Sequence, residues 1–137
     1  AAAGCDATVR LAAIPQPLSH PDEVVFLNNV GATYNALQAA MTLGIERAII
    51  ASSISAYGMA WGRPTFPPRY APIDEAHPFL AKDPYALSKE TTESMGRMFH
   101  RATFHWTRII HSLRMSPTPC QRKRTSESRK CLSGVVV

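Results

Sequence analysis

The chain has few cysteines and no long hydrophobic run. Its 137 residues hold Cys5, Cys120 and Cys131, an odd number at spacings that fit neither a disulfide framework nor a zinc site. No apolar stretch approaches the ~20 residues that a membrane-spanning helix needs, and no secretory leader is recognisable before the first strand-like segment. These absences predict one core without a metal or a membrane partner, in a reducing and therefore cytoplasmic compartment.

Acidic side chains are scarce at the end of the chain. Residues 1–96 carry six basic and nine acidic side chains, whereas residues 97–137 carry nine basic and one acidic, so the net charge of +5 arises in the second segment. Its basic run at Arg122-Lys123-Arg124 is of a kind that binds nucleic acid or directs localisation. Because the run lacks stacking partners and periodicity, we expect residues 1–105 to be globular and 106–137 to be a solvated, disordered tail without a nucleic acid partner.

The first part of the chain alternates strand-like and helix-like patterns. Residues 7–13 are a short apolar segment, and the unbroken apolar run at 47–53 is typical of a strand buried on both faces of a parallel sheet. A helix is expected between them, over residues 21–43. Its expected core-facing stripe, at a period of 3.6, is Val24, Leu27, Val30, Tyr34, Leu37 and Met41. This order predicts a βαβ unit with adjacent parallel strands.

A second helix carries the most informative pair of residues. Asp83 and Pro84 supply a cap and a first-turn proline for this helix. Tyr85 and Lys89 are four residues apart and share one helix face. A lysine charge beside a phenol favours the phenolate, which provides the proton donor and acceptor that alcohol–carbonyl redox chemistry needs. The expected core-facing stripe on another side is Leu87, Thr91, Met95, Met98 and Ala102.

In this order, the motifs resemble those of the extended short-chain dehydrogenase/reductase family. This is the group of NAD-dependent epimerases and dehydratases that act on sugars and sugar nucleotides. The resemblance covers residues 6–100. The motifs that carry it are Leu11-Ala12-Ala13, Asn28-Asn29-Val30-Gly31-Ala32-Thr33, Ala51-Ser52-Ser53 followed by Tyr57-Gly58, and Pro84-Tyr85 with Lys89.

The resemblance implies a role for each motif. Tyr85 would be the acid/base, Lys89 would tune it and bind the nicotinamide ribose, and Ser53 would hydrogen-bond the reacting oxygen. Ser53 is preferred to Ser52 because it stands four residues before Tyr57, which is the family's spacing. The resemblance implies NAD or NADP as the cofactor, with contacts at Leu11, Ala12, Ala13, Ile14, Asn28, Ser52, Tyr85 and Lys89. A sugar-type small molecule is the implied substrate, and a homodimer of the full-length protein remains open.

Two departures from the family pattern limit these expectations. The glycines never take the Gly-x-x-Gly-x-x-Gly spacing of the phosphate loop. We therefore expect an α/β fold, a partial Rossmann-like doubly wound parallel sheet that lacks the N-terminal phosphate-loop unit and the C-terminal substrate domain. In this interpretation the chain is an internal fragment, and the residues after Arg101 do not match the family. Ile54 and Ser55 stand where the family's dehydratases carry acidic residues, which disfavours dehydration.

Two functions remain open from the sequence. The first is a truncated NAD(P)-dependent oxidoreductase or epimerase that acts on a sugar or sugar nucleotide. The second is a non-catalytic remnant or interaction module that keeps the fold without binding the cofactor.

Overall fold

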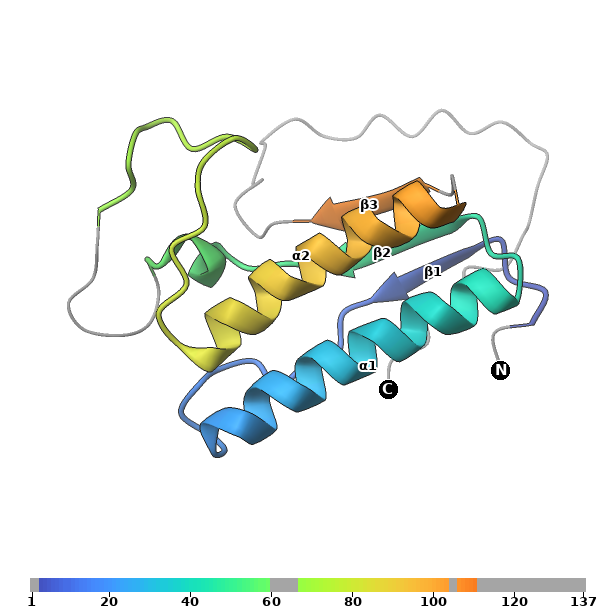
Figure 1. Ribbon diagram of the computed structural model, residues 1–137, viewed down its shortest axis with the longest axis horizontal. Coiled ribbons are helices and arrows are strands. Elements are labelled where there is room, and N and C mark those ends of the chain that lie inside the picture. The colour runs from blue at the N-terminus through green and yellow to red at the C-terminus, as the bar shows by residue number, and fades with distance from the viewer. Residues whose placement is uncertain (1–2, 60–66, 104–105, 111–137) are drawn as a thin grey trace, which may run out of the picture.

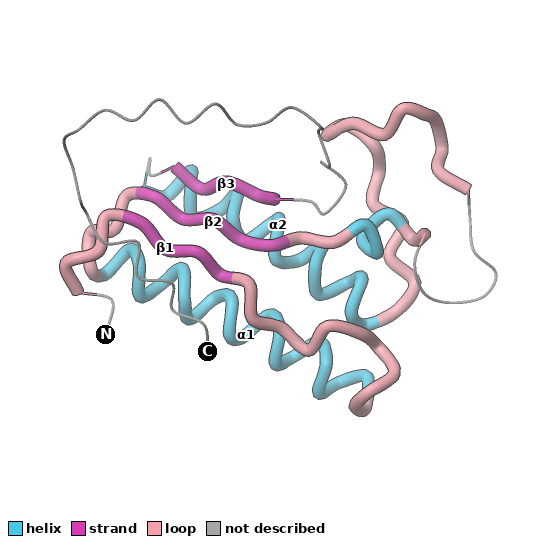
Figure 2. Tube along the Cα trace, turned by 180° about the vertical axis from the view of Figure 1, so that it is seen from behind, coloured by secondary structure: helices cyan, strands magenta, loops and turns pink. Residues whose placement is uncertain are grey.

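The computed structural model describes residues 3–59, 67–103 and 106–110. Six elements follow one another: β1 (Ala7–Arg10), α1 (Asp22–Thr42), β2 (Arg47–Ala51), the 3-10 helix η1 (Ile54–Tyr57), α2 (Pro84–Thr103) and β3 (Trp106–Ile110). Both long helices lie against the same face of the sheet (Figure 1). Seen from behind, the strands lie in front of the helices, and no described helix covers this second face (Figure 2).

The sheet is parallel, in the order β1-β2-β3. Ala7 pairs with Arg47 and Arg10 with Ile50, so the predicted βαβ unit, with α1 between two adjacent parallel strands, is confirmed. β3 pairs with the other edge of β2 and lies within the segment that was expected to be a tail. Residues 111–137, the rest of that segment, lie outside the described residues.

The sheet-facing side of α1 differs from the expected stripe. Its buried residues are Val25, Asn29, Thr33, Leu37 and Ala40. Of the expected stripe only Leu37 is fully buried, whereas Val24, Leu27 and Tyr34 are 40–64% exposed, so the prediction is wrong for these three residues. Asn29 and Thr33 are tolerated inside because their side chains are hydrogen-bonded, and a hydrophobic pattern gives no weight to such residues.

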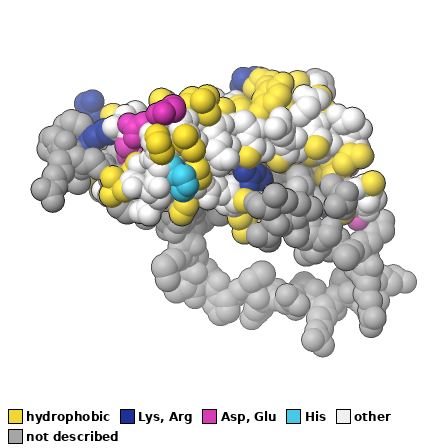
Figure 3. All heavy atoms as spheres, turned by 90° about the horizontal axis from the view of Figure 1, so that it is seen from below, with side chains coloured by type: hydrophobic (Ala, Val, Ile, Leu, Met, Phe, Trp, Pro, Cys, Tyr) yellow, Lys and Arg dark blue, Asp and Glu magenta, His cyan; other side chains and the backbone are white. Residues whose placement is uncertain are grey.

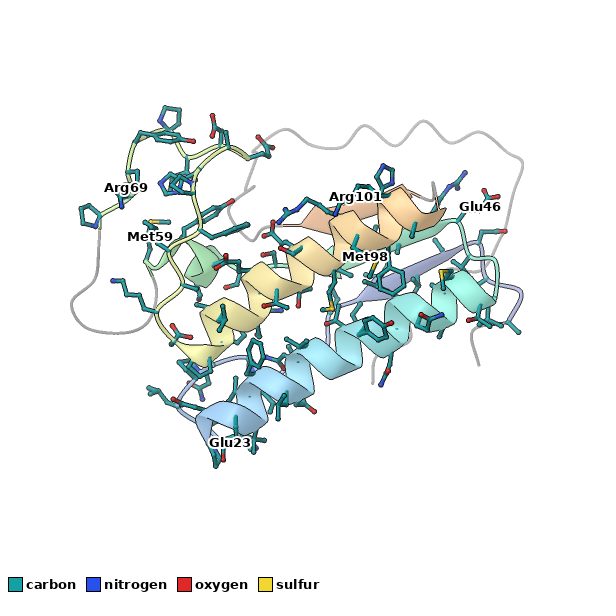
Figure 4. The ribbon with its side chains drawn as sticks, viewed as in Figure 1. Glu23, Glu46, Met59, Arg69, Met98 and Arg101 are labelled. Atoms are coloured by element: carbon teal, nitrogen blue, oxygen red, sulfur yellow. The ribbon has the colours of Figure 1, made fainter. Side chains whose placement is uncertain are left out.

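The expected stripe of α2 is wrong for a related reason. Leu87 and Met98 are 46% and 39% exposed, and Met98 lies in the last turns of α2, in front of the sheet (Figure 4). The buried face instead carries Tyr85, Ala86, Ser88, Lys89, Thr92, Glu93 and Phe99. This face is largely polar, and its polar side chains other than Tyr85 have partners on β2 and α1 or within α2 itself. Only Met95 of the expected stripe packs against the core.

The hydrophobic core lies between the two helices and β2. It consists of Leu37, Ala48, Ile50 and Phe99, with Met41 and Met95 packed against it. Phe99 also meets Tyr34 edge to face, with 5.4 Å between the ring centroids. In the described ranges no helix is both long and apolar enough to cross a membrane.

Backbone contacts fix the segment between β2 and α2 at its base. Gly58 has a φ of +78°, and a Cβ added there would lie 2.4 Å from the carbonyl oxygen of Leu80. The amide of Leu80 donates to Ala56 O at 3.0 Å, which brings the chain back beside η1 before α2 begins. The expected cap at Asp83 is confirmed, because its Oδ1 accepts from the amide of Ala86 at 2.8 Å. The start of α2 is thereby held close to the end of β2.

Candidate active site at the carboxyl ends of the first two strands

Lys89 and Tyr85 meet at the carboxyl end of β2. Lys89 Nζ donates to the carbonyl oxygen of Ala51, the last residue of β2, at 2.9 Å, and lies 5.5 Å from the centroid of the Tyr85 ring. Lys89 is 6% and Tyr85 8% exposed. Among the described residues, the Tyr85 hydroxyl makes no hydrogen bond. A buried phenol without a partner is suited to receive a ligand oxygen.

Burial changes the acidity of the lysine. Desolvation, with a smaller contribution from the charge of Arg10, lowers the pKa of Lys89 from 10.5 to about 8. Both causes disfavour the charged ammonium. Lys89 therefore loses its proton at a lower pH than an exposed lysine does.

The two serines after β2 have different partners. Ser53 caps η1: its Oγ accepts from the amide of Ser55 at 3.2 Å and donates to the Ser55 hydroxyl at 3.1 Å. The cap fixes Ser53 two residues beyond the carbonyl that holds Lys89. Ser52 instead donates to Glu93 Oε1 at 2.5 Å and is buried. The Ser52 hydroxyl thus ties β2 to α2, and its expected cofactor contact stays a prediction.

Glu93 is a residue of the site that sequence reasoning missed. Its carboxylate is buried, accepts from Ser52, and is 3.5 Å from the guanidinium of Arg97. Glu93 follows Lys89 by one helical turn, and this spacing was the available signal. Lys89 is hydrogen-bonded to Ala51 and Glu93 to Ser52, so two successive turns of α2 bind the end of β2.

Asn29, rather than Asn28, connects the loop after β1 to both helices. Its Oδ1 accepts from the amide of Ile14 at 2.8 Å, and its Nδ2 donates to Ile14 O at 3.1 Å and to Ser88 Oγ at 3.3 Å. Ser88 Oγ in turn donates to the carbonyl oxygen of Tyr85 at 2.7 Å. Asn29 is 2% exposed. One amide therefore links the expected cofactor loop to the turn of α2 that carries the phenol.

An open groove of about 650 Å³ runs between β1, the loop after it and α1. Of the expected cofactor-contacting residues, Ala12, Ala13, Ile14 and Asn28 line it, and Leu11 does not. The α1 wall is made mainly of small side chains, and Arg10 is the one charged residue of the lining. Most of the expected cofactor contacts thus lie in this groove, apart from the Tyr85–Lys89 pair and the two serines.

A histidine organises the loop between η1 and α2. His77 is 3% exposed, accepts from the amide of Arg69 at 2.9 Å through Nε2, and contacts the rings of Tyr57 and Tyr70. Tyr70 donates to Asp74 at 2.6 Å, which raises the pKa of Tyr70 to about 12. Every group in this cluster is engaged by another part of the loop, so the cluster has a structural role.

The arrangement suits proton transfer at an oxygen atom. A phenol, an amine of lowered pKa and a capped hydroxyl belong to segments that meet at the carboxyl end of β2, where open parallel α/β sheets bind ligands. The sequence profile of the family described as "NAD dependent epimerase/dehydratase family" matches residues 1–135. The chain belongs to this family of extended short-chain dehydrogenases/reductases. The match continues beyond Arg101, so the expectation that the later residues do not match is wrong.

Individual relatives agree with this assignment. The chain is 30% identical over 102 residues to the NAD-dependent glucose-6-phosphate dehydrogenase of Haloferax volcanii, an alignment that covers 71% of this chain and 38% of that protein. A short-chain dehydrogenase/reductase superfamily protein from Agrobacterium tumefaciens, solved with bound NAD, has 30% identity and a TM-score of 0.68 over 79% of this chain and 31% of its own. The dTDP-glucose 4,6-dehydratase DesIV of Streptomyces venezuelae has 27% identity and a TM-score of 0.68 over 80% and 32%. The chain therefore spans between three and four tenths of the length of these relatives.

Proposed function

We propose that this chain carries the acid/base centre of an NAD(P)-dependent oxidoreductase or epimerase that acts on a sugar or sugar nucleotide. One observation carries the proposal: Tyr85 is buried, its hydroxyl has no hydrogen-bond partner among the described residues, and it lies beside a lysine whose Nζ is held on the end of β2. A structural tyrosine at this depth would have its hydroxyl paired.

Each residue has a distinct task in this proposal. Tyr85 Oη takes the proton from a substrate hydroxyl during oxidation and returns it to the carbonyl oxygen during reduction. Lys89 stays on Ala51 O and holds its Nζ 5.5 Å from the centroid of the Tyr85 ring, beside the phenol that exchanges the proton. Ser53 donates to the same substrate oxygen once it exchanges its bond to Ser55. The bound dinucleotide supplies the hydride acceptor.

The residues of the groove fit a dinucleotide. Small side chains at Ala12, Ala13 and Ala32 allow a flat ring to approach the backbone, and Asn28 offers an amide at the rim. The main chain of Ile14 is held by Asn29 and so keeps a fixed position toward a ligand. Leu11, which is 60% exposed, would contribute through its backbone.

The type of reaction is argued from η1. Ile54 and Ser55 follow the capping serine, and neither supplies the carboxylate that would help to eliminate water. The curated relative from Haloferax volcanii is by its name a dehydrogenase of a sugar phosphate. Both facts support oxidation–reduction or epimerisation over dehydration for this chain.

A graft into that relative tests the proposal. The aligned stretch of the Haloferax enzyme is replaced by the matching 71% of this chain, and reduction of NAD by glucose 6-phosphate is followed by absorbance. We expect turnover, and a fall in kcat of at least about 100-fold in the graft with Tyr85→Phe. Tyr70→Phe, in the loop cluster, is the matched control and should leave kcat unchanged.

The same graft separates the two functions left open by the sequence. Turnover that survives Tyr85→Phe would contradict the assigned role of the phenol. A folded graft that never reduces NAD would favour the non-catalytic module instead.

A further inference from the structure

We propose that Arg10 and Lys89 together form a receptor for one phosphate-type anion at the carboxyl ends of β1 and β2. The inference rests on the proposed function only in that it shares Lys89 with the proposed centre. Arg10 has no role in the acid/base chemistry set out above.

The register of the sheet aims Arg10 toward this site. Arg10 is the last residue of β1 and pairs in register with Ile50 of the parallel strand β2. Paired residues of neighbouring strands point to the same face, and Ile50 is 1% exposed beneath the helices. The next residue of β2 is Ala51, whose carbonyl oxygen holds Lys89 Nζ. The two cations therefore belong to neighbouring strand ends on the helix-covered face.

Neither cation has an acidic partner. Within the described ranges no ion pair joins Arg10 or Lys89 to a carboxylate, the guanidinium of Arg10 makes no hydrogen bond, and the ion pair on α2 joins Arg97 to Glu93. The other ionisable groups on the elements packed around Lys89 do not neutralise it. On α1 these are Asp22, Glu23 and Tyr34, all exposed; on β2, the exposed Arg47; on η1, Tyr57; and on α2, Tyr85, Glu90, the engaged Glu93, Arg97, His100 and Arg101. Two like charges partly removed from water, without a counter-charge, favour an incoming anion.

Arg10, which lines the groove, and Lys89, which lies outside its lining, together define the chemistry of that anion. The planar guanidinium of Arg10 can donate to two phosphate oxygens at once, and a lysine ammonium adds a compact charge. Asn28 and Asn35 add amide donors, and the small side chains of α1 leave room for an attached ring or sugar. The ligand class is therefore a phosphate ester or a pyrophosphate, borne either by the cofactor or by a sugar phosphate.

Titration of Lys89 by NMR tests the receptor without any catalytic step. The side-chain signals of the isotopically labelled chain are followed against pH, with and without inorganic pyrophosphate. We expect pyrophosphate to raise the titration midpoint of Lys89, because a bound anion favours the ammonium. Arg10→Gln should weaken pyrophosphate binding by about tenfold or more, since it removes a charge-assisted contact. It should also raise the midpoint in the free chain, because a like charge is lost.

Arg97→Gln is the matched control, because this guanidinium lies on the same helix as Lys89 but is paired with Glu93. It should bind pyrophosphate as the parent does, and circular dichroism establishes that both variants are folded. Equal binding by the Arg10→Gln variant and the parent, or a midpoint of Lys89 that pyrophosphate leaves unmoved, overturns the proposal.

Two further ligands identify the source of the phosphate. If nicotinamide mononucleotide shifts the Lys89 and Arg10 signals and glucose 6-phosphate does not, the receptor binds a phosphate of the cofactor. If only glucose 6-phosphate shifts these signals, the receptor binds a phosphate of the substrate. If neither of these ligands nor pyrophosphate shifts the signals, the proposed receptor does not exist. Loss of the receptor alone leaves the effect of Tyr85→Phe on the graft intact, so the two proposals fail separately.

Discussion

At the scale of single residues, the site is built from polar side chains held inside the protein. Lys89 is the clearest case, since burial lowers its pKa from 10.5 to about 8 while its Nζ stays bonded to Ala51 O. In the unfolded chain the amine returns to its ordinary pKa. The folded chain therefore binds fewer protons between pH 8 and 10.5, and stability should rise with pH across that window.

This linkage predicts the effect of Lys89→Met. Below pH 8, burial of the charged lysine lowers the free energy of unfolding by at most about 3 kcal/mol, and its hydrogen bond to Ala51 raises it by about 1 kcal/mol. We expect Lys89→Met to raise the free energy of unfolding at pH 7 by about 1–2 kcal/mol, measured by urea denaturation. The difference between variant and parent should shrink as the pH rises toward 10.5. A difference that stays constant or grows with pH would contradict the lowered pKa.

A second residue-scale prediction concerns the turn after η1. Gly58→Ala would place a Cβ against the carbonyl oxygen of Leu80 at a positive φ. We expect a loss of about 2–4 kcal/mol in the free energy of unfolding, since the backbone of the neighbouring segment must move. Gly31→Ala, in α1, meets nothing within 4 Å and should gain up to about 1 kcal/mol. Equal effects of the two variants would show that the close approach at Gly58 does not constrain the chain.

The sequence predicted the residue types of the site better than their individual positions. Tyr85 and Lys89 follow from helical periodicity, because residues four apart must share a face. Asn29 and Glu93 did not emerge, because their importance depends on Ile14, Ser88 and Ser52, which are distant in sequence. Two adjacent asparagines look alike in a sequence, and only the docking of α1 on the sheet separates the buried one from the exposed one.

At the scale of elements, the order and direction of β1, α1 and β2 could be predicted, and the helix faces could not. An apolar run between turn signals defines a strand whatever packs on it. A helix face is defined by its partner, and here the sheet-facing sides carry Asn29, Ser88 and Glu93. β3 was underestimated, because its side-chain pattern is poor and it gains its pairing from the edge of β2.

Two leucines of α1 test which face is inside. Leu37 is 4% exposed in the core, whereas Leu27 is 64% exposed. We expect Leu37→Ala to lower the free energy of unfolding by about 2–4 kcal/mol and Leu27→Ala to change it by less than about 0.5 kcal/mol. Thermal or urea unfolding measures both. Comparable losses of unfolding free energy in the two variants would show that Leu27 is buried, as the hydrophobic pattern predicted.

The outward apolar side chains of the two helices also bear on assembly. Val24, Leu27 and Tyr34 on α1 and Leu87 and Met98 on α2 are exposed. Hydrophobic side chains also recur over the described surface in the space-filling view (Figure 3). Such faces would suit a contact between two copies of this chain, the homodimer that the sequence left open.

At the scale of the whole molecule, the chain has the groove and the Tyr85–Lys89 pair that we propose for the nicotinamide side of a dinucleotide, but no phosphate-loop glycine spacing. In related folds, the loop and the helix behind it grip the pyrophosphate. In place of the phosphate loop, the chain has the groove beside β1, the Tyr85–Lys89 pair and Arg10. Binding of NAD by these 137 residues alone should therefore be weak and confined to this end of the sheet.

Titration of the isotopically labelled chain with NAD, followed by two-dimensional NMR, tests this account most directly. We predict a dissociation constant on the order of 1 mM, with shifts concentrated at residues 11–14, Ser53, Tyr85 and Lys89. The Tyr70–His77 loop cluster should remain unperturbed. A micromolar dissociation constant, or shifts that avoid Tyr85 and Lys89, would contradict it.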